Sequence, residues 1–312
     1  MGELPSVIVH YDGKTRVSAE FRGNLRAAVW DRYGRYLTVV GERGYLARLE
    51  DEDTVRINSY TTQNLRALSV NPTDGSLLIV GNSGTVLSLD EQGRLTKLTS
   101  PSSENLRAVA WNPSGTMALI AGNNGTLIEY SNERFKSIDG ARANLRDISW
   151  RPGSNEALIA SNCFAGEFLP SPNLFTYNAT QKDLQAVNES RADLIGVDWR
   201  PDGKVALVAG YDVVWHTGVI AEYDGRVTSA ITFENKRVYP TSVRWNTSAK
   251  TAAIATATSD IGMGVGMICL WDGANVNEVF RSDSFFFSDV AWAQGADRLA
   301  AVASTVTRAF NA

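Results

Sequence analysis

The residues in this chain best suited to chemistry are four arginines that recur in one short phrase. The phrase is Asn-Leu-Arg, and its arginines, Arg26, Arg66, Arg107 and Arg146, stand 40, 41 and 39 residues apart. A guanidinium group carries a lasting positive charge and offers five donors in a planar fork that matches a carboxylate or a phosphate. If the repeat brings these side chains together, they predict recognition of an anion.

Patterns for catalysis and metal binding are weak in this sequence. It has no Gly-x-Ser-x-Gly elbow, no phosphate or calcium loop and no metal-ligand spacing of His and Cys. The glycine-rich stretch 262–266 precedes an expected strand, whereas a dinucleotide loop opens a helix. We therefore predict no catalytic residue, no metal ligand and no cofactor. The sequence leaves open whether carboxylates converge at the centre of the fold.

The spacing of the phrase indicates the elements that position it. A fixed period near 40 residues is typical of a stacked repeat or a propeller, and not of a doubly wound enzyme. Each unit contains an apolar run ending at a marker residue, a turn rich in Pro and Gly, a buried apolar strand, a hairpin, an alternating strand and a short last strand. The markers are Trp30, Val70, Trp111, Trp150, Trp199, Trp245 and Trp292. Four short strands per unit predict the blade of a β-propeller.

The two ends of the chain complete one blade. Counting the third strands also yields seven, but the first of them ends at Tyr11, before the first marker. Residues 6–20 therefore supply a third and a fourth strand, and residues 286–307 supply a first and a second. We predict that these segments pair, because closing the ring removes exposed sheet edges. The predicted fold is all-β, a seven-bladed propeller of four-stranded blades that forms one domain over residues 1–312.

The pattern resembles that of WD40 propellers along the whole chain. An x-Pro-x-Gly turn follows several inner strands, and Trp271-Asp272 ends one third strand. This resemblance implies a ring that serves as an interaction scaffold. No unit has the Gly-His of that family, and His10 and His216 stand elsewhere, so the family's buried His–Asp network is not expected. Other repeat propellers with Gly-x-x-Gly hairpins also fit.

The amino-acid composition limits the classes of binding partner and the cellular compartment that we expect. The net charge of −4 disfavours general attraction to nucleic acid, so any basic site must be a local patch. Cys163 and Cys269 fall in different units, which favours free thiols and a reducing compartment. The sequence has neither a signal-peptide pattern nor an apolar run long enough to span a membrane. We expect a monomeric cytoplasmic protein.

The alternation of connections between the two faces of a propeller places the phrase beside the hairpins that join second and third strands. Side chains alternate with period two, so we expect Asn and Arg to share the strand face of the marker. The arginines then form an arc over half of the channel rim, and the Asn bonds its own turn. Basic residues of the entering loops widen this arc: Arg22, Arg142, Arg191, Lys236 and Arg237. The alternative is structural, with each arginine stacked on aromatic rings or paired to an acidic residue of the neighbouring blade, such as Asp147, Glu104 or Glu42.

Long hairpins form a second candidate site on the same face. The hairpins of units four to six expand to about 160–172, 210–217 and 257–266. Their candidate contacts, with one from an entering loop, are Phe164, Tyr211, Trp215, His216, Met263 and Phe286. Apolar loop tips on one face predict a recognition surface or a lid, or a plug without a ligand.

These features predict a non-catalytic interaction module that binds an acidic or anionic partner, a peptide or a phosphoprotein, on the face that carries the phrase. The alternative is a propeller enzyme, such as a hydrolase or lactonase, with its site at the channel mouth. Local binding of nucleic acid through the arginines is a third hypothesis, and the net charge of −4 disfavours it.

Overall fold

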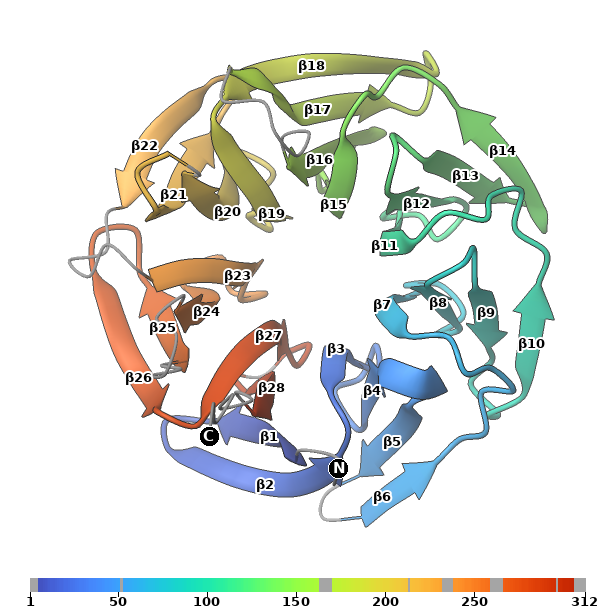
Figure 1. Ribbon diagram of the computed structural model, residues 1–312, viewed down its shortest axis with the longest axis vertical. Helices are drawn as coiled ribbons and strands as arrows, with labels where there is room; N and C mark the ends of the chain where they lie inside the picture. The colour runs from blue at the N-terminus through green and yellow to red at the C-terminus, as the bar shows by residue number, and fades with distance from the viewer. Residues whose placement is uncertain are drawn as a thin grey trace, which may run out of the picture.

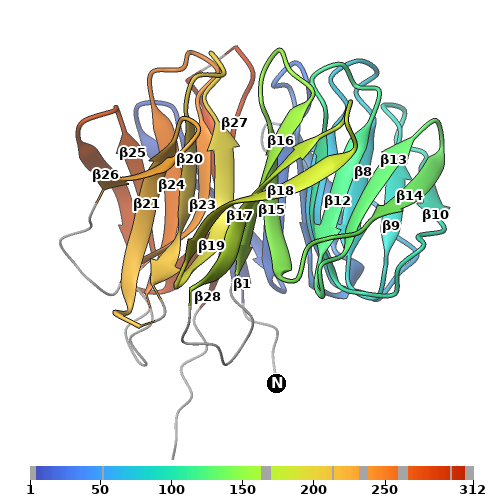
Figure 2. The same cartoon turned by 90° about the horizontal axis from the view of Figure 1, so that it is seen from above.

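The computed structural model describes residues 5–50, 53–162, 170–212, 214–231, 238–258, 266–295 and 297–305. These residues form seven four-stranded antiparallel sheets arranged as blades around one axis (Figure 1). Each blade runs from an inner strand near the axis to an outer strand at the rim, and the strands extend between two faces of the ring (Figure 2). The predicted all-β, seven-bladed fold is confirmed.

The first four blades follow one another along the chain, and the strands of each are in sequence order from the axis outward. Blade 1 is β3 (Leu25–Trp30), β4 (Leu37–Gly41), β5 (Leu46–Glu50) and β6 (Asp53–Arg56), with a short 3-10 turn, η1 (Glu42–Gly44), between β4 and β5. Blade 2 is β7 (Leu65–Val70), β8 (Leu77–Gly81), β9 (Val86–Leu89) and β10 (Leu95–Leu98). Blade 3 is β11 (Leu106–Trp111), β12 (Ala118–Gly122), β13 (Leu127–Ser131) and β14 (Arg134–Ile138). Blade 4 is β15 (Asn144–Trp150), β16 (Glu156–Asn162), β17 (Ser171–Asn178) and β18 (Asp183–Ser190).

The last three blades include the one that joins the two ends of the chain. Blade 5 is β19 (Ala192–Trp199), β20 (Ala206–Asp212), β21 (Thr217–Tyr223) and β22 (Val227–Ile231). Blade 6 is β23 (Val238–Trp245), β24 (Ala252–Thr258), β25 (Gly266–Trp271) and β26 (Val276–Ser282). Blade 7 is β27 (Phe285–Trp292), β28 (Leu299–Thr305), β1 (Pro5–Tyr11) and β2 (Thr15–Arg22).

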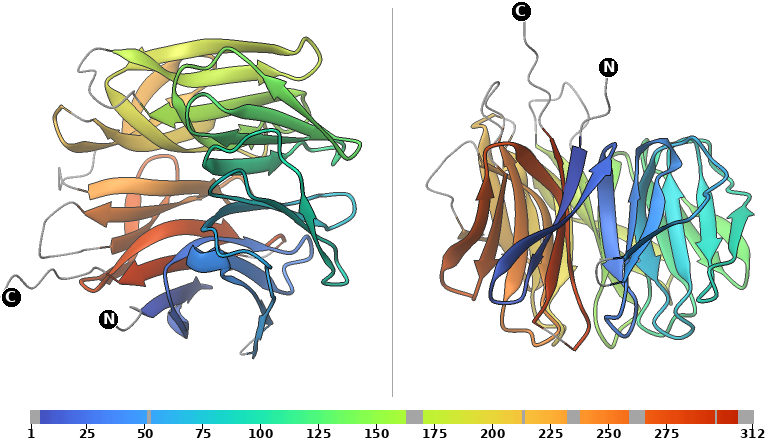
Figure 3. Two further views of the ribbon diagram at one scale, coloured as in Figure 1. Left: turned by 45° about the vertical axis from the view of Figure 1, so that its right-hand side comes forward. Right: turned by 90° about the horizontal axis from the view of Figure 1, so that it is seen from below.

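Blade 7 closes the ring as the strand count predicts. β1 pairs with β28 in antiparallel register, beginning with Ser6 opposite Ser304, so strands from the two ends of the chain lie side by side (Figure 3). The hydroxyl of Ser6 ties this blade to blade 1, because it donates to the carbonyl of Gly23 at 2.5 Å and accepts from the amide of Leu25 at 3.1 Å.

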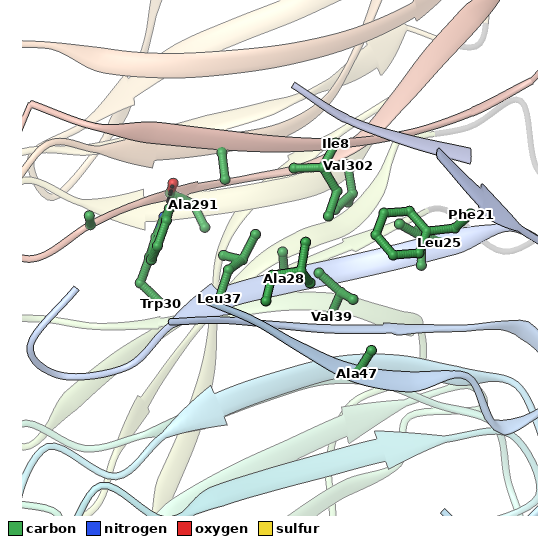
Figure 4. Close-up of a cluster of buried hydrophobic side chains, with 13 residues drawn as sticks. Ile8, Phe21, Leu25, Ala28, Trp30, Leu37, Val39, Ala47, Ala291 and Val302 are labelled. Atoms are coloured by element: carbon green, nitrogen blue, oxygen red, sulfur yellow. Dashed lines mark hydrogen bonds between the residues drawn. The ribbon is translucent and has the colours of Figure 1, made fainter. Parts of the chain in front are cut away.

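Apolar side chains fill the spaces between blades. The described residues contain seven buried clusters, each drawn from two neighbouring blades. At the junction of blades 7 and 1, Ile8 and Val302 lie near Leu25 and Val39 (Figure 4). Burying an aliphatic side chain of this size stabilises the fold by about 1.5–3 kcal/mol. The core therefore holds the blades to one another.

Three of the six marker tryptophans add a polar link between neighbouring inner strands. The indole Nε1 of Trp150 donates to the carbonyl oxygen of Ala110 at 3.0 Å, and that of Trp30 donates to Ala291 at 3.2 Å. The marker of blade 7 makes the same bond to blade 6. In each case the acceptor directly precedes the marker of the preceding blade. The indole N–H groups of the other three are buried and have no hydrogen-bond partner among the described residues, so this bond alone does not explain why tryptophan recurs here.

Each inner strand contains a β-bulge near its start, on the side where the chain enters the blade. In β3, Leu25 pairs with Gly41 and Ala27 pairs with Val40, so Arg26 has no partner across the ladder. The same shift interrupts all seven inner strands. A bulge bends the strand and redirects the side chain of the extra residue.

The bulge corrects the prediction that Asn and Arg share the strand face of the marker. Strict alternation would place Leu25 opposite Trp30, yet Leu25, Ala28 and Trp30 belong to one buried cluster. The extra residue reverses the alternation, because two residues of the bulged strand face one residue of its partner. Arg26 therefore occupies a special backbone position instead of a regular strand face.

Among the described residues, no helix has the length and apolar character needed to cross a membrane. Cys269 is a buried free thiol in the core between blades 5 and 6. Burial raises the pKa of this thiol to about 12, so it stays protonated near neutral pH. Cys163 lies outside the described residues.

Candidate anion-binding site

The four phrase arginines occupy one structural position, the bulge of the inner strand. The residues at this position in blades 1 to 7 are Arg26, Arg66, Arg107, Arg146, Ile195, Thr241 and Ser288. Four consecutive blades thus carry a guanidinium at the same height, and three carry an uncharged side chain. We call Arg26, Arg66, Arg107 and Arg146 the arginine arc.

The phrase lies against the hairpins that join second and third strands, and we call this side of the ring the hairpin face. The amide of Glu42 donates to the carbonyl of Asn24 at 2.9 Å, and the amide of Asn82 donates to that of Asn64 at the same distance. Gly81 lies so close to this strand that a Cβ would stand 2.4 Å from the Asn64 carbonyl oxygen. The predicted proximity of phrase and hairpin is confirmed.

Three of the four phrase asparagines hold the hairpin of the preceding blade, whereas Asn24 donates to Glu42 of its own blade. Asn105 Oδ1 accepts from the amide of Ser83 at 3.1 Å, and Asn144 Oδ1 accepts from the amide of Asn124 at 2.9 Å. Ser83 and Asn124 both have a φ of +52°, the left-handed conformation that leaves an amide free for such a bond. The prediction that these asparagines bond their own turn is therefore wrong, although their role is structural.

The two central arginines of the arc are held by amide groups. Arg66 Nε donates to Asn82 Oδ1 at 2.9 Å, and Arg107 Nε donates to Asn123 Oδ1 at 3.1 Å. Both arginines are half-buried, and their terminal nitrogens bond to no residue in the described ranges. Each guanidinium is fixed along one edge, and its fork of two terminal nitrogens remains available.

The arginines at the ends of the arc differ from this pair. Arg26 forms an ion pair with Glu42, which occupies in blade 1 the hairpin position of Asn82. Arg146 Nε and Asn162 Oδ1 are both buried and have no hydrogen-bond partner among the described residues. Burial lowers the pKa of Arg146, and the charge of Asp193 partly opposes this shift. Both ends therefore have a carboxylate nearby.

The charges of the arc act on one another. Burial lowers the pKa of Arg107 to about 10, and Arg66, Arg146 and Arg26 act in the same direction. The pKa of Arg66 is also lowered, first by burial and then by Arg26. The four arginines therefore lie within electrostatic range of one another. A pKa of about 10 leaves Arg107 positively charged at neutral pH.

The structural alternative of pairing with acids of the neighbouring blade does not describe the central pair. Glu42 pairs with Arg26 within its own blade, although its charge also acts on Arg66, and Asp147 pairs with Arg244. Glu104 makes no ion pair with an arginine in the part of the chain that the structure describes. The sequence reasoning missed Asn82 and Asn123. Each stands 16 residues after its arginine, directly after a hairpin glycine, and this spacing could have been read from the repeat.

The long-hairpin site predicted from the sequence adjoins the arginine arc at Tyr211. This residue occupies the hairpin position of Asn82 in blade 5, opposite Asp193. It hydrogen-bonds Asp193, and its ring contacts the edge of the Tyr239 ring at 5.2 Å between centroids. Burial raises the pKa of Tyr211 to about 12, and Asp193 acts in the same direction. The phenol is therefore neutral, and Arg146 lies near it.

Other predicted contacts are dispersed over the same face. Trp215 is 73% exposed, and the neighbouring His216 is also exposed with a φ of +51°. Arg142 is exposed in the loop entering blade 4, whereas Phe286 is half-buried at the start of β27. The structure adds Tyr60, which is 77% exposed on the loop entering blade 2. Phe164, Met263, Lys236 and Arg237 lie outside the described residues.

Carboxylates do converge along the inner strands, which answers a point that the sequence left open. Arg244 Nη1 donates to Asp147 Oδ2 at 2.8 Å, and the charges of Asp147, Asp289 and Asp198 together raise the pKa of Arg244. The Arg244 side chain is 31% exposed, so water reaches this group. We call these four residues the axial cluster.

The axial carboxylates are occupied by bonds between blades. Asp198 Oδ2 accepts from the amide of Trp245 at 2.7 Å, and Asp289 Oδ2 accepts from the amide of Ala28 at 3.2 Å. Burial raises the pKa of Asp198 to about 6 and also raises that of Asp289, while Arg244 opposes both shifts. Within the described ranges, no group of three or more His, Cys, Asp or Glu side chains is arranged to hold a metal ion.

The fold and this site define a seven-bladed β-propeller with an arginine arc on its hairpin face. No family model and no curated protein matches the chain. The solved β-propeller domain of Myceliophteria thermophila Cps50 (Swd1) is similar with 12% identity and a TM-score of 0.66, over 95% of this chain and 100% of that domain. Kuenenia stuttgartiensis hydrazine synthase is similar with 14% identity and a TM-score of 0.72, over 93% and 95%. At these identities the likeness is one of fold alone.

Proposed function

We propose that this protein is a non-catalytic interaction module that binds an acidic or anionic partner, a peptide or a phosphoprotein, on its hairpin face. The observation that carries the proposal is the state of Arg66 and Arg107. Each donates a hydrogen bond from its Nε to an asparagine, and neither forms an ion pair with a described residue. Half-buried charges without counter-ions are costly, and an anion supplied by a partner would compensate them.

The surroundings of the arc support a macromolecular partner. Tyr60 and Trp215 project from loops of the hairpin face and are the two most exposed large apolar side chains among the described residues. Tyr60 holds a φ of +52°, which is unusual for a bulky residue, and its amide bonds Asn58 Oδ1 at 3.0 Å. Exposed aromatic residues and arginines are enriched at protein interfaces.

No specific observation favours the hydrolase or lactonase alternative. The axial carboxylates are the groups on which such an enzyme would depend, and Asp147, Asp198 and Asp289 accept bonds that join blades. Nucleic-acid binding is disfavoured by the net charge of −4. From the composition and the pattern of the sequence, we further propose that the protein acts as a monomer in the cytoplasm.

The proposal is tested with two fluorescein-labelled probes, an oligoglutamate peptide and a phosphoserine peptide, by fluorescence anisotropy. We expect the double variant Arg66→Ala/Arg107→Ala to bind at least one probe about 30-fold more weakly than the parent, since truncating a contacting, desolvated charge costs about 2 kcal/mol or more. The matched control is Arg94→Ala/Arg281→Ala, which removes the same charge from exposed arginines that pair with Asp90 and Glu278.

The control variant should bind like the parent. Equal binding by all three proteins would show that the arc is not the site. A parent that binds neither probe would overturn the proposal of an anionic partner.

A further inference from the structure

We propose that the group read by the arginine arc is a phosphomonoester dianion seated between Arg66 and Arg107, an inference that rests on the proposed anion-binding function. The shared chemistry is a terminal phosphate with two negative charges. It would be carried by a phosphorylated side chain of a partner protein.

The charge balance of the arc sets the charge of the ligand. Glu42 forms its ion pair with Arg26 and acts on Arg66 through its charge alone, and Asp193 acts on Arg146 at the other end of the arc. Arg66 and Arg107 retain two positive charges without an ion pair to a described residue. A monoanion would leave one of these charges uncompensated, whereas a dianion balances both.

The bonding of the two guanidinium groups sets the shape of the ligand. Because Asn82 and Asn123 hold the two Nε atoms, the fork of terminal nitrogens is the free part of each group. A carboxylate has two oxygens, and a single arginine fork satisfies both. A phosphomonoester has three terminal oxygens in a tetrahedral arrangement, so it can accept from forks on two neighbouring blades at once.

The two asparagines add neutral donors to the same place. Since each Oδ1 accepts from an arginine Nε, each Nδ2 amide remains a donor, and it bonds to no described residue. Glu42 stands at the corresponding position of blade 1 and would repel a phosphate. The preferred seat is therefore between blades 2 and 3.

The test compares phenyl phosphate with phenyl sulfate, a tetrahedral isostere with a single negative charge, by isothermal titration calorimetry. At about pH 7.5, where the phosphate is mostly a dianion, we expect phenyl phosphate to bind about 10-fold or more tightly than phenyl sulfate. At about pH 5 the phosphate is a monoanion, and the two affinities should converge. Affinity for phenyl sulfate should change little between these conditions, because its charge stays constant.

Two single variants locate the site. Asn82→Glu places a carboxylate where blade 1 has Glu42, and it should pair with Arg66 and abolish the preference for phosphate without loss of the fold. Ser114→Glu adds the same charge at an exposed residue on the opposite face and should leave binding unchanged. Circular dichroism spectra of both variants should match that of the parent and thereby show that they are folded.

The outcomes separate this inference from the proposed function. If phenyl phosphate and phenyl sulfate bind equally, or if neither binds while the oligoglutamate peptide does, the phosphate inference is wrong and the anion-binding function stands. Retention of the phosphate preference in Asn82→Glu would also overturn the seat between blades 2 and 3. If no anionic probe binds the parent protein, both proposals fail.

Discussion

Arg66 and Arg107 are half-buried, and each uses only its Nε for bonding within the described part of the protein. Arg244 has the opposite environment, because it is bonded to Asp147 and surrounded by two further carboxylates. The two kinds of arginine therefore have different roles in the protein. Arg66 and Arg107 are charges without an ion pair in the described part of the protein, whereas Arg244 links distant inner strands.

Replacing the central arginines should therefore cost little stability. In Arg66→Ala/Arg107→Ala, the loss of two hydrogen bonds to asparagine, each worth about 1 kcal/mol, is offset by relief of repulsion within the arc. We expect the free energy of unfolding in urea to change by no more than about 1 kcal/mol. The free energy of unfolding of the variant should be most favourable relative to the parent at low salt, where the repulsion between the arginines of the parent is least screened. A loss of about 3–5 kcal/mol would instead identify these arginines as structural ion pairs.

Asp198 gives a pH-dependent prediction. Burial raises its pKa to about 6, above the value in the unfolded chain. Between these two pKa values the folded protein binds more protons than the unfolded protein, so this group makes stability fall as pH rises through about 4 to 6. Asp198→Asn removes this titration, but its amide has one acceptor oxygen for the bonds that Asp198 accepts from Ser149 and Trp245. The free energy of unfolding of the variant relative to the parent should therefore be higher near pH 7 than near pH 4 by about 1–2 kcal/mol, discounted for water at the axis.

Asp202 provides a control, because its pKa is shifted in the opposite direction to that of Asp198. The Arg200 side chain and the amide of Lys204 bond to its carboxylate and lower its pKa. Its contribution to stability is present near neutral pH and is lost as pH falls through the lowered pKa. Asp202→Asn should therefore never be more stable than the parent in thermal melts recorded across this range. If Asp198→Asn behaves in the same way, the charge of Asp198 is compensated in the folded state.

The hairpins of blades 1 to 3 act as connectors between blades. In blade 2, the amide of Gly84 donates to the carbonyl of Glu104 at 2.7 Å, and Asn105 accepts from the amide of Ser83. The same hairpin carries Asn82, the partner of Arg66. One short element thus joins two blades and sets the position of an arginine in the arc.

Gly84 should be the least replaceable residue of this hairpin. It has a φ of +64°, and a Cβ would lie 1.8 Å from the carbonyl oxygen of Ser102. Gly153 has a similar φ of +69° but no atom within 4 Å of the Cβ position. We expect Gly153→Ala to cost about 1–2 kcal/mol for the left-handed backbone alone, and Gly84→Ala to cost about 2 kcal/mol more. Equal losses of melting temperature would show that the hairpin moves without penalty.

The whole molecule depends on the joint between its two ends. Blade 7 takes its two outer strands, β1 and β2, from the start of the chain, and Ser6 bonds both blade 7 and blade 1. Removing these strands exposes the edge of β28 and uncovers the core around Ile8.

Deletion of residues 1–20 should lower the melting temperature strongly and promote association through the open edge. A circular permutant that links the neighbouring ends of β28 and β1 and opens the exposed turn at Gly93 keeps every blade, so it should fold with near-parent stability. Size-exclusion chromatography and thermal melts distinguish the two results. A deletion variant that is monomeric and as stable as the parent would show that β1 and β2 are not needed for closure.

The sequence by itself determined the architecture, because blades are local units. The marker tryptophans, the Pro and Gly turns and the apolar runs depend on residues within about 40 positions, so their period was enough to count seven blades and to predict the closure by residues 6–20. It also placed four arginines at equivalent positions and predicted the side of the ring on which they lie. Strict alternation failed at one point, since nothing in the local pattern announced the bulge at Arg26.

The tertiary structure decided which partner each charge has. Arg244 bonds Asp147 across 97 residues, and no local pattern connects them. Glu42 and Asn82 stand at equivalent hairpin positions, yet only the first gives its arginine a counter-ion. Pairing of charges is set by distance, burial and competing hydrogen bonds, which exist only once the blades have packed. For this reason the arc was predictable from the sequence, and the available charges of Arg66 and Arg107 were not.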